Sequence, residues 1–73
     1  MHQSEITILR QHIIEEYEAI KQGLSGLAWG TSKHDIIDLR MRRVDRYQQQ
    51  LASQVGEQEA TSTIYDLYNQ VMG

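Results

Sequence analysis

The sequence predicts a small all-α protein: an antiparallel bundle of three helices, two of them long and the third shorter. Three observations favour this fold. Apolar residues recur at steps of three, four and seven through three segments, which is the period of an α-helix. The chain has no proline, and apart from its last residue its glycines lie at 23–30 and 56, between those segments. Its 73 residues suffice for one domain, 1–73.

The first predicted helix spans residues 4–22. Ser4 is a suitable N-cap, because its hydroxyl can accept a hydrogen bond from a free backbone N–H, and Glu5 follows where the helix dipole favours an acid. Gly23 is expected to end the helix as its C-cap. The apolar stripe is too short for an extended coiled coil, which favours a small bundle. It comprises Ile6, Leu9, Ile13, Tyr17, Ile20 and Leu24.

A glycine-rich connector is expected after the first helix, at residues 23–31. It is not a solvated linker, because it also contains Leu24, Leu27, Ala28 and Trp29. We expect it to fold over one end of the bundle with Trp29 as the anchor, since so large an aromatic side chain usually finds cover. A groove for a ligand or partner, in which the glycines permit close approach, is the alternative. The pattern leaves open whether residues 24–29 form a helical turn or a loop.

The central predicted helix spans residues 33–55 and contains neither glycine nor proline. Thr31 or Ser32 is expected to cap it, and at 1.5 Å per residue it would be roughly 34 Å long. Its apolar residues are Ile37, Met41, Val44, Leu51 and Val55. Gly56 should end it and turn the third helix, 57–72, back antiparallel. That helix has Ala60, Ile64, Leu67, Tyr68 and Val71 on one face, with Tyr65 and Met72 at its margins.

The composition limits the possible functions. A chain of this size has a small core, and the absence of cysteine excludes disulfides and zinc sites built from cysteine. Oligomerisation is the remaining common way to supplement such a core. No segment approaches the roughly twenty apolar residues of a membrane span, and the polar first residues do not resemble a secretory signal. We therefore expect a cytoplasmic protein that does not associate with membranes.

The charges are unevenly distributed, although the net charge is only −3. The central helix carries five basic residues against three acids, whereas the first and third segments are acidic. Arg42 and Arg46 share an outward stripe of the central helix, with Arg43 nearer its apolar side, and such a stripe could bind nucleic-acid phosphates. Asp38 and Asp45, however, lie four and three residues from Arg42. Pairing within the protein is therefore favoured over nucleic-acid binding.

Arg40 differs from the other arginines of the central helix, because it falls between Ile37 and Val44 on the apolar side. A charge at such a position must extend to solvent or find a partner. We expect it to pair with a carboxylate across the interface of the first two helices, and Glu16 is the candidate.

One short pattern resembles the turn of a helix-turn-helix DNA reader. Ala19, Gly23 and Leu24, followed by Ser25, supply the small residue, the glycine and the hydrophobic residue that set the bend in such a turn. The reading helix would follow Ser25, but Gly26 and Gly30 would interrupt it, and each glycine inside a helix costs about 1 kcal/mol relative to alanine. We therefore interpret the match as a chance resemblance rather than as a true helix-turn-helix.

Two histidine–acid pairs have the spacing of metal ligands on one helix face: His12 with Glu16, and His34 with Asp38. Di-metal bundles use a richer set of acids from several helices, so a surface histidine that lies near an acid by chance is the favoured interpretation. The sequence also contains no nucleophile motif and no phosphate-binding loop. We therefore expect no enzyme activity, no catalytic residue, no metal and no cofactor.

Two aliphatic residues lie where charged ones are expected. Leu39 projects about 140° from Val44, on the charged face of the central helix, and Ile8 is similarly opposed to the stripe of the first helix. The chain thus has more apolar surface than one three-helix core can cover, and self-association would cover it. We hypothesise a homodimer whose interface includes Ile8, Leu39, Arg42, Arg43 and Arg46.

The expected function is that of a small non-enzymatic, homo-oligomeric protein-interaction or regulatory module. Its partner would be a second copy of the chain or another protein. The alternative is a nucleic-acid-binding regulator that uses the arginine stripe of the central helix. Ligand binding at the Trp29 connector is a third hypothesis.

Overall fold

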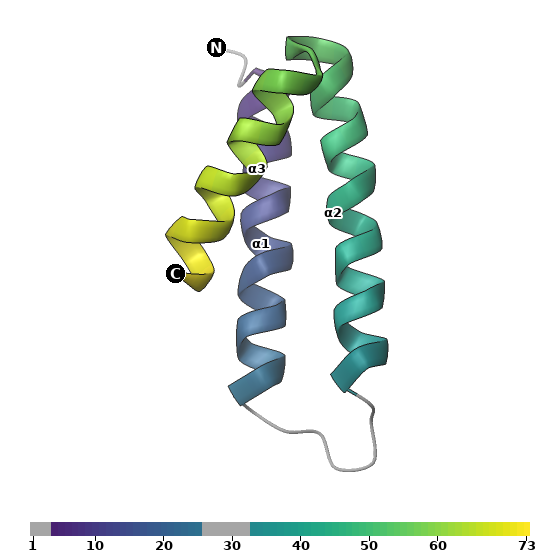
Figure 1. Ribbon diagram of the computed structural model, residues 1–73, viewed down its shortest axis with the longest axis vertical. Coiled ribbons are helices and arrows are strands. Elements are labelled where there is room, and N and C mark those ends of the chain that lie inside the picture. The colour runs from purple at the N-terminus through teal and green to yellow at the C-terminus, as the bar shows by residue number, and fades with distance from the viewer. Residues whose placement is uncertain (1–3, 26–32) are drawn as a thin grey trace.

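The computed structural model describes residues 4–25 and 33–73, which form three helices. They are α1 (Glu5–Ser25), α2 (Lys33–Val55) and α3 (Glu57–Met72). The two long helices lie side by side and antiparallel, and α3 turns back from the end of α2 to cross over α1 (Figure 1). Each helix packs against the other two. The predicted fold class, an all-α bundle of two long helices and one shorter helix, is confirmed.

The N-terminus of α1 is capped as its sequence predicts. The Thr7 backbone N–H donates to the Ser4 hydroxyl oxygen over 3.1 Å, and the Ile8 N–H donates to the Ser4 carbonyl over 3.1 Å. A side-chain oxygen that accepts from the first turn satisfies one of the donors that a helix leaves free at its start. Ser4 is therefore the N-cap of α1.

The prediction that Gly23 ends α1 is wrong, because the helix continues to Ser25. A methyl group added at Gly23 would lie 3.6 Å from the Ile36 side chain, so the last part of α1 packs against the start of α2. A glycine inside a helix costs only about 1 kcal/mol, which tertiary contacts can offset. The Trp29 anchor, the caps at Thr31 and Ser32 and the conformation of the connector fall on residues 26–32, outside the described residues.

Gly56 both ends α2 and begins α3, and both boundaries agree with the prediction. Its φ of 90° lies in the left-handed region that favours glycine. Its N–H donates to the Ala52 carbonyl over 2.8 Å, and its own carbonyl accepts from the Ala60 N–H over 3.0 Å. A single residue thus closes one helix and starts the next, which brings α3 back onto the bundle.

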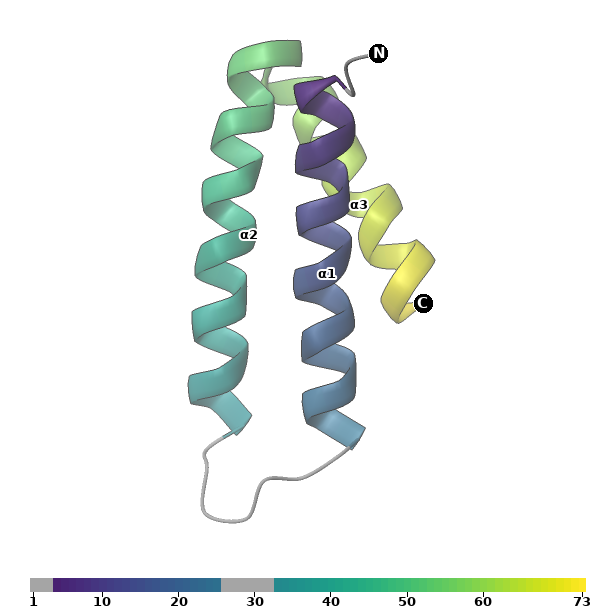
Figure 2. The same cartoon turned by 180° about the vertical axis from the view of Figure 1, so that it is seen from behind.

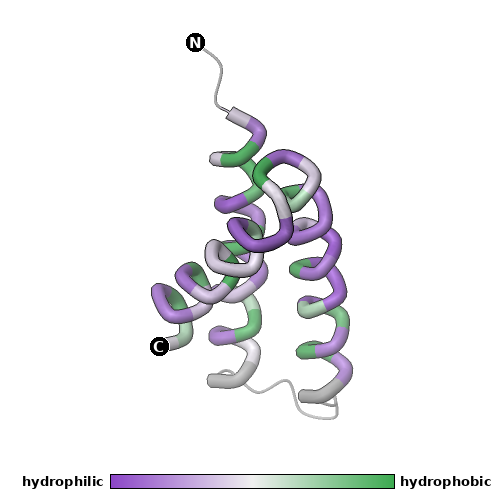
Figure 3. The backbone as a smooth tube through the Cα atoms, turned by 45° about the horizontal axis from the view of Figure 1, so that its top comes forward, coloured by the Kyte–Doolittle hydropathy of each residue, from purple (hydrophilic) through white to green (hydrophobic). Residues whose placement is uncertain are grey.

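The core contains residues from all three helices. Hydrophobic residues recur at intervals along each helix, between hydrophilic ones (Figure 3). Among the residues whose burial the structure describes, the predicted stripes supply every buried apolar one: Leu9, Ile13, Tyr17, Ile20, Val44, Leu51, Ala60 and Leu67. Met41 departs from its stripe, with 37% of its surface exposed.

Two residues of α3 also depart from the predicted pattern. Thr63 is buried although it is polar, and its hydroxyl donates to the Glu59 carbonyl of the same helix over 2.9 Å. Tyr68 is 45% exposed, yet its ring meets that of buried Tyr17 edge to face, with 5.5 Å between centroids. In the part of the chain that the structure describes, no helix combines the length and the apolar character that crossing a bilayer requires.

Candidate functional site

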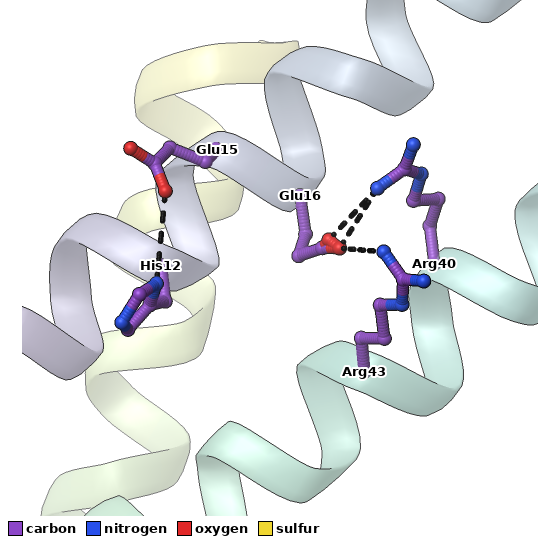
Figure 4. Close-up of polar contacts among 5 residues, drawn as sticks. All are labelled: His12, Glu15, Glu16, Arg40 and Arg43. Carbon is purple, nitrogen blue, oxygen red and sulfur yellow. Dashed lines mark hydrogen bonds and ion pairs between the residues drawn. The ribbon is translucent and has the colours of Figure 1, made fainter.

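An ion cluster around the buried carboxylate of Glu16 joins α1 to α2. Glu16 extends from α1 toward two arginines of α2 (Figure 4). Nη1 of Arg40 lies 3.1 Å from Oε1 and 3.2 Å from Oε2 of Glu16, and Nη1 of Arg43 lies 3.4 Å from Oε1. Only 7% of the Glu16 side chain is exposed. The predicted pair of Arg40 with Glu16 is confirmed, and Arg43 is a second partner that the sequence did not reveal.

This cluster determines which arginines of α2 form ion pairs. A buried carboxylate needs a positive partner, so Glu16 engages Arg40 and Arg43 across the helix interface. Among residues 4–25 and 33–73, Arg42 pairs with neither Asp38 nor Asp45, contrary to the expectation from their spacing. Ion pairs between exposed side chains gain little in water, so spacing alone does not enforce them. Arg42 and Arg46 make no ion pair in the described residues.

His12 lies beside this cluster, over a tyrosine of the neighbouring helix. Its ring stacks on that of Tyr47 with 5.1 Å between centroids and 11° between planes. Its Nδ1 lies 3.6 Å from a carboxylate oxygen of Glu15 (Figure 4). The pair of His12 with Glu16 that metal binding would need does not form, because Glu16 turns to the arginines. No group of three or more potential metal ligands occurs among the described side chains.

A shallow groove of about 430 Å³ runs between the N-terminal half of α1 and the C-terminal half of α2. A hydrogen bond closes one end, where Gln54 Nε2 donates to Glu5 Oε2 over 2.8 Å. The groove is lined by Glu5, Ile8, Leu9, His12, Tyr47, Gln50, Ser53 and Gln54. The exposed Ile8 therefore borders a depression rather than a flat surface.

The groove and the ion cluster belong to one surface, the side of the α1–α2 pair that faces away from α3 (Figure 2). We call it the open face. At about 100° per residue, α1 contributes to it Ile8, His12, Glu15 and Ala19, and α2 contributes Leu39, Arg43, Arg46 and Gln50. Ile8 is 41% exposed and Leu39 is 51% exposed, as the sequence predicts.

Of the five residues predicted for the interface, Arg42 is the outlier. Arg42 immediately precedes Arg43, which contacts Glu16 at the seam between α1 and α2. Consecutive residues of a helix point about 100° apart, so Arg42 points away from that seam. Ile8, Leu39, Arg43 and Arg46 share the open face. Glu15 and Ala19 also lie on the open face. Their positions in the helical period relative to the buried Ile13 would have sufficed to predict this from the sequence.

The open face is divided by charge along the seam. From α1 it receives the acids Glu5, Glu15 and Glu16, together with His12, and neither lysine nor arginine from the described part of α1 lies on it. From α2 it receives the bases Arg40, Arg43 and Arg46 against one acid, Asp35, which lies about 20° from Arg46 by the helical period. The ion cluster across the seam uses Glu16 and leaves Glu15 exposed on one helix and Arg46 exposed on the other. The surface therefore has an acidic half and a basic half.

The structure does not support two further candidates, a helix-turn-helix motif and Tyr17 as a general base. The helix-turn-helix alternative needs a turn at Gly23, but α1 continues without interruption to Ser25. Burial raises the pKa of the Tyr17 hydroxyl, and the nearby Tyr68 and Asp45 raise it further. Tyr17 therefore stays protonated near neutral pH and serves as a core residue rather than as a base.

Comparison of the chain with protein-family models, with curated proteins and with solved structures finds no match.

Proposed function

We propose that the protein is a small non-enzymatic interaction module that works as a homo-oligomer and binds through its open face. One observation carries the proposal. Ile8 and Leu39 remain 41% and 51% exposed on the same face, although each of the three helices already buries other apolar residues in the core. Apolar surface removed from water gains roughly 25 cal/mol per Å², so covering these side chains is favourable.

The residues around the two aliphatic side chains fit a binding surface. Arginine and tyrosine are enriched where proteins meet, and the open face has Arg43, Arg46 and the half-buried Tyr47 between Ile8 and Leu39. A bundle of this size has a small core, for which association is a common supplement. Both arguments support the open face as the part of the molecule that acts.

The two exposed tyrosines of α3 are less suited to the role. Tyr65 is 66% exposed and Tyr68 is 45% exposed. Their hydroxyl groups tolerate water, and the Tyr68 ring already packs against Tyr17. An aliphatic side chain has no polar group that water can satisfy, so Ile8 and Leu39 carry more weight.

The polar groups of the described residues support a non-enzymatic role. The most buried carboxylate, Glu16, is occupied by Arg40 and Arg43. The buried hydroxyl of Tyr17 has a raised pKa and stays protonated. Neither is placed to exchange a proton with a substrate, since both lie between packed helices.

The direct test is the mass in solution as a function of concentration. Light scattering at micromolar concentration should give a mass above the 8.5 kDa of one chain. Leu39→Glu should shift the mass toward the monomer with helicity retained, because it puts a charge where an apolar contact is proposed. The matched control is Gln49→Glu, an exposed residue of the same helix in the groove on the α3 side, and it should leave the mass unchanged. A mass of 8.5 kDa at every concentration would contradict the proposal.

A nucleic-acid-binding regulator remains the second candidate, favoured by one observation: Arg42 and Arg46 have no ion-pair partner among the described residues. Phosphate contacts of this kind would make binding fall steeply with salt. Binding should also disappear in the variant Arg42→Ala/Arg46→Ala. A chain that binds neither DNA nor RNA at low salt excludes this candidate.

A further inference from the structure

We propose that the second copy docks parallel to the first, with a twofold axis along the bundle, so that α1 of each copy lies over α2 of the other. The inference rests on the proposed self-association and specifies the geometry of the partner. It is carried by the division of the open face into an acidic half on α1 and a basic half on α2.

The charge division distinguishes the two simple ways of joining this face to itself. An isologous interface uses the same patch on both copies. With the twofold axis across the bundle, the copies are antiparallel and each helix meets itself, so acids face acids and arginines face arginines. With the axis along the bundle, α1 meets α2 twice and opposite charges face each other. Like charges brought together at an interface are costly, which favours the parallel arrangement.

The internal register of the bundle determines which residues would meet. Three contacts define how α1 and α2 lie side by side: Glu5 with Gln54, His12 with Tyr47, and Glu16 with Arg43. In this register Glu15 is level with Val44, between Arg43 and Arg46. Likewise, Ala19 is level with Arg40, next to Leu39. A twofold axis along the seam keeps each residue at its level and moves it onto the other helix.

The parallel arrangement therefore brings together exposed residues of the two copies that can form ion pairs or apolar contacts with each other. Glu15 would meet Arg46 of the partner subunit, and Leu39 would meet Ala19 of the partner subunit. Within the chain, the polar contact of Glu15 is with His12 Nδ1 at 3.6 Å, and Arg46 makes no ion pair among the described residues. Each contact occurs twice because of the symmetry, so a small surface gains two ion pairs and two apolar contacts.

A charge exchange tests the pairing of Glu15 with Arg46. Glu15→Arg alone and Arg46→Glu alone should each weaken self-association by about tenfold or more, because each replaces two attractive pairs by two repulsive ones. The double variant Glu15→Arg/Arg46→Glu restores opposite charges and should return the dissociation constant to within about threefold of the original. Sedimentation over a range of concentrations gives these constants, and circular dichroism checks that each variant stays helical.

The control is Glu18→Arg, which changes the net charge as Glu15→Arg does but lies in the groove between α1 and α3. It should leave the dissociation constant almost unchanged. Equal weakening by Glu18→Arg and Glu15→Arg, or a double variant weaker than both single variants, would overturn the parallel arrangement. If the wild-type chain dimerises but the charge exchange does not restore the dissociation constant, the parallel arrangement is wrong and the proposed self-association still holds. A monomeric wild-type chain loses both.

Thiol cross-linking gives an independent measurement, because the chain has no cysteine of its own. Ala19→Cys and Leu39→Cys, prepared separately and mixed, should be joined by a short thiol-specific cross-linker in preference to either variant with itself. The control mixture of Ile8→Cys with Leu39→Cys should give little product, since these residues lie near opposite ends of the open face. Preferential cross-linking in the control mixture would overturn the parallel arrangement.

Discussion

The two sides of the α1–α2 pair are held by different kinds of contact. On the side that α3 covers, buried apolar residues such as Ile13, Val44 and Leu67 pack together, and the buried hydroxyl of Thr63 is satisfied within its own helix. The open face instead has an ion cluster around the buried carboxylate of Glu16, and it leaves Leu39 exposed. The comparison indicates that the covered side stabilises the fold, whereas the open face is available for binding.

The largest expected effect is on the covered side. Leu67 has no exposed surface, so Leu67→Ala should remove about 2–5 kcal/mol from the free energy of unfolding, enough to unfold much of a protein this small. Leu39→Ala on the open face should change it by less than about 0.5 kcal/mol in dilute solution, where association does not contribute. Urea unfolding measures both. Equal losses would remove the distinction between the two sides.

The ion cluster should contribute less than the core but more than surface charges do. Glu16→Gln leaves Arg40 and Arg43 without a charged partner beside a buried amide, and we expect a loss of about 1–3 kcal/mol in the free energy of unfolding. Glu18→Gln, at an exposed position, should cost less than about 0.5 kcal/mol. If the two variants are equally stable, the cluster does not hold α1 to α2.

Two glycines should respond in opposite directions. Gly56→Ala puts a side chain at a φ of 90° with no atom within 4 Å of the new carbon, so its cost is conformational and about 1–2 kcal/mol. Gly23→Ala lies inside α1, where the methyl group would meet Ile36 at 3.6 Å, and it should be neutral or stabilising by up to about 1 kcal/mol. Thermal unfolding compares them. Destabilisation by Gly23→Ala would mean that α1 ends at this residue.

The smallest effect concerns alkaline pH. Because burial raises the pKa of Tyr17 above its ordinary value of 10.0, the unfolded chain loses this proton first as the pH rises. The contribution of Tyr17 to stability is therefore complete below pH 10 and declines above it. Tyr17→Phe should make the alkaline decline shallower, since the exposed or half-buried Tyr47, Tyr65 and Tyr68 are common to both proteins. Identical pH profiles of unfolding would contradict the raised pKa.

The covered side could be predicted from the sequence because it follows the helical period. The bounds of α2 and α3, and the apolar residues that the structure shows to be buried, follow from the spacing of apolar residues and from Gly56. Gly23 was misjudged because its preference for a helix end competes with packing against Ile36, a contact between residues that the spacing does not relate. Thr63 was missed because its burial depends on a hydrogen bond within its own helix.

The open face was less predictable because it depends on how two helices are registered. The pair of Arg40 with Glu16 could be anticipated, since a charge beside an apolar stripe needs a partner. The second arginine, Arg43, and the stacking of His12 on Tyr47 require the register of α1 against α2, which no pattern within either helix contains. The exposure of Ile8 and Leu39, by contrast, follows from helical phase alone.

The most direct test of the open face as the binding surface is to follow backbone amide resonances while the protein is diluted. The resonances that shift should be those of Ile8, Ala19, Leu39 and Arg46, and those of the exposed Tyr65 on α3 should stay constant. Shifts confined to α3, or no shift at any concentration, would contradict the account.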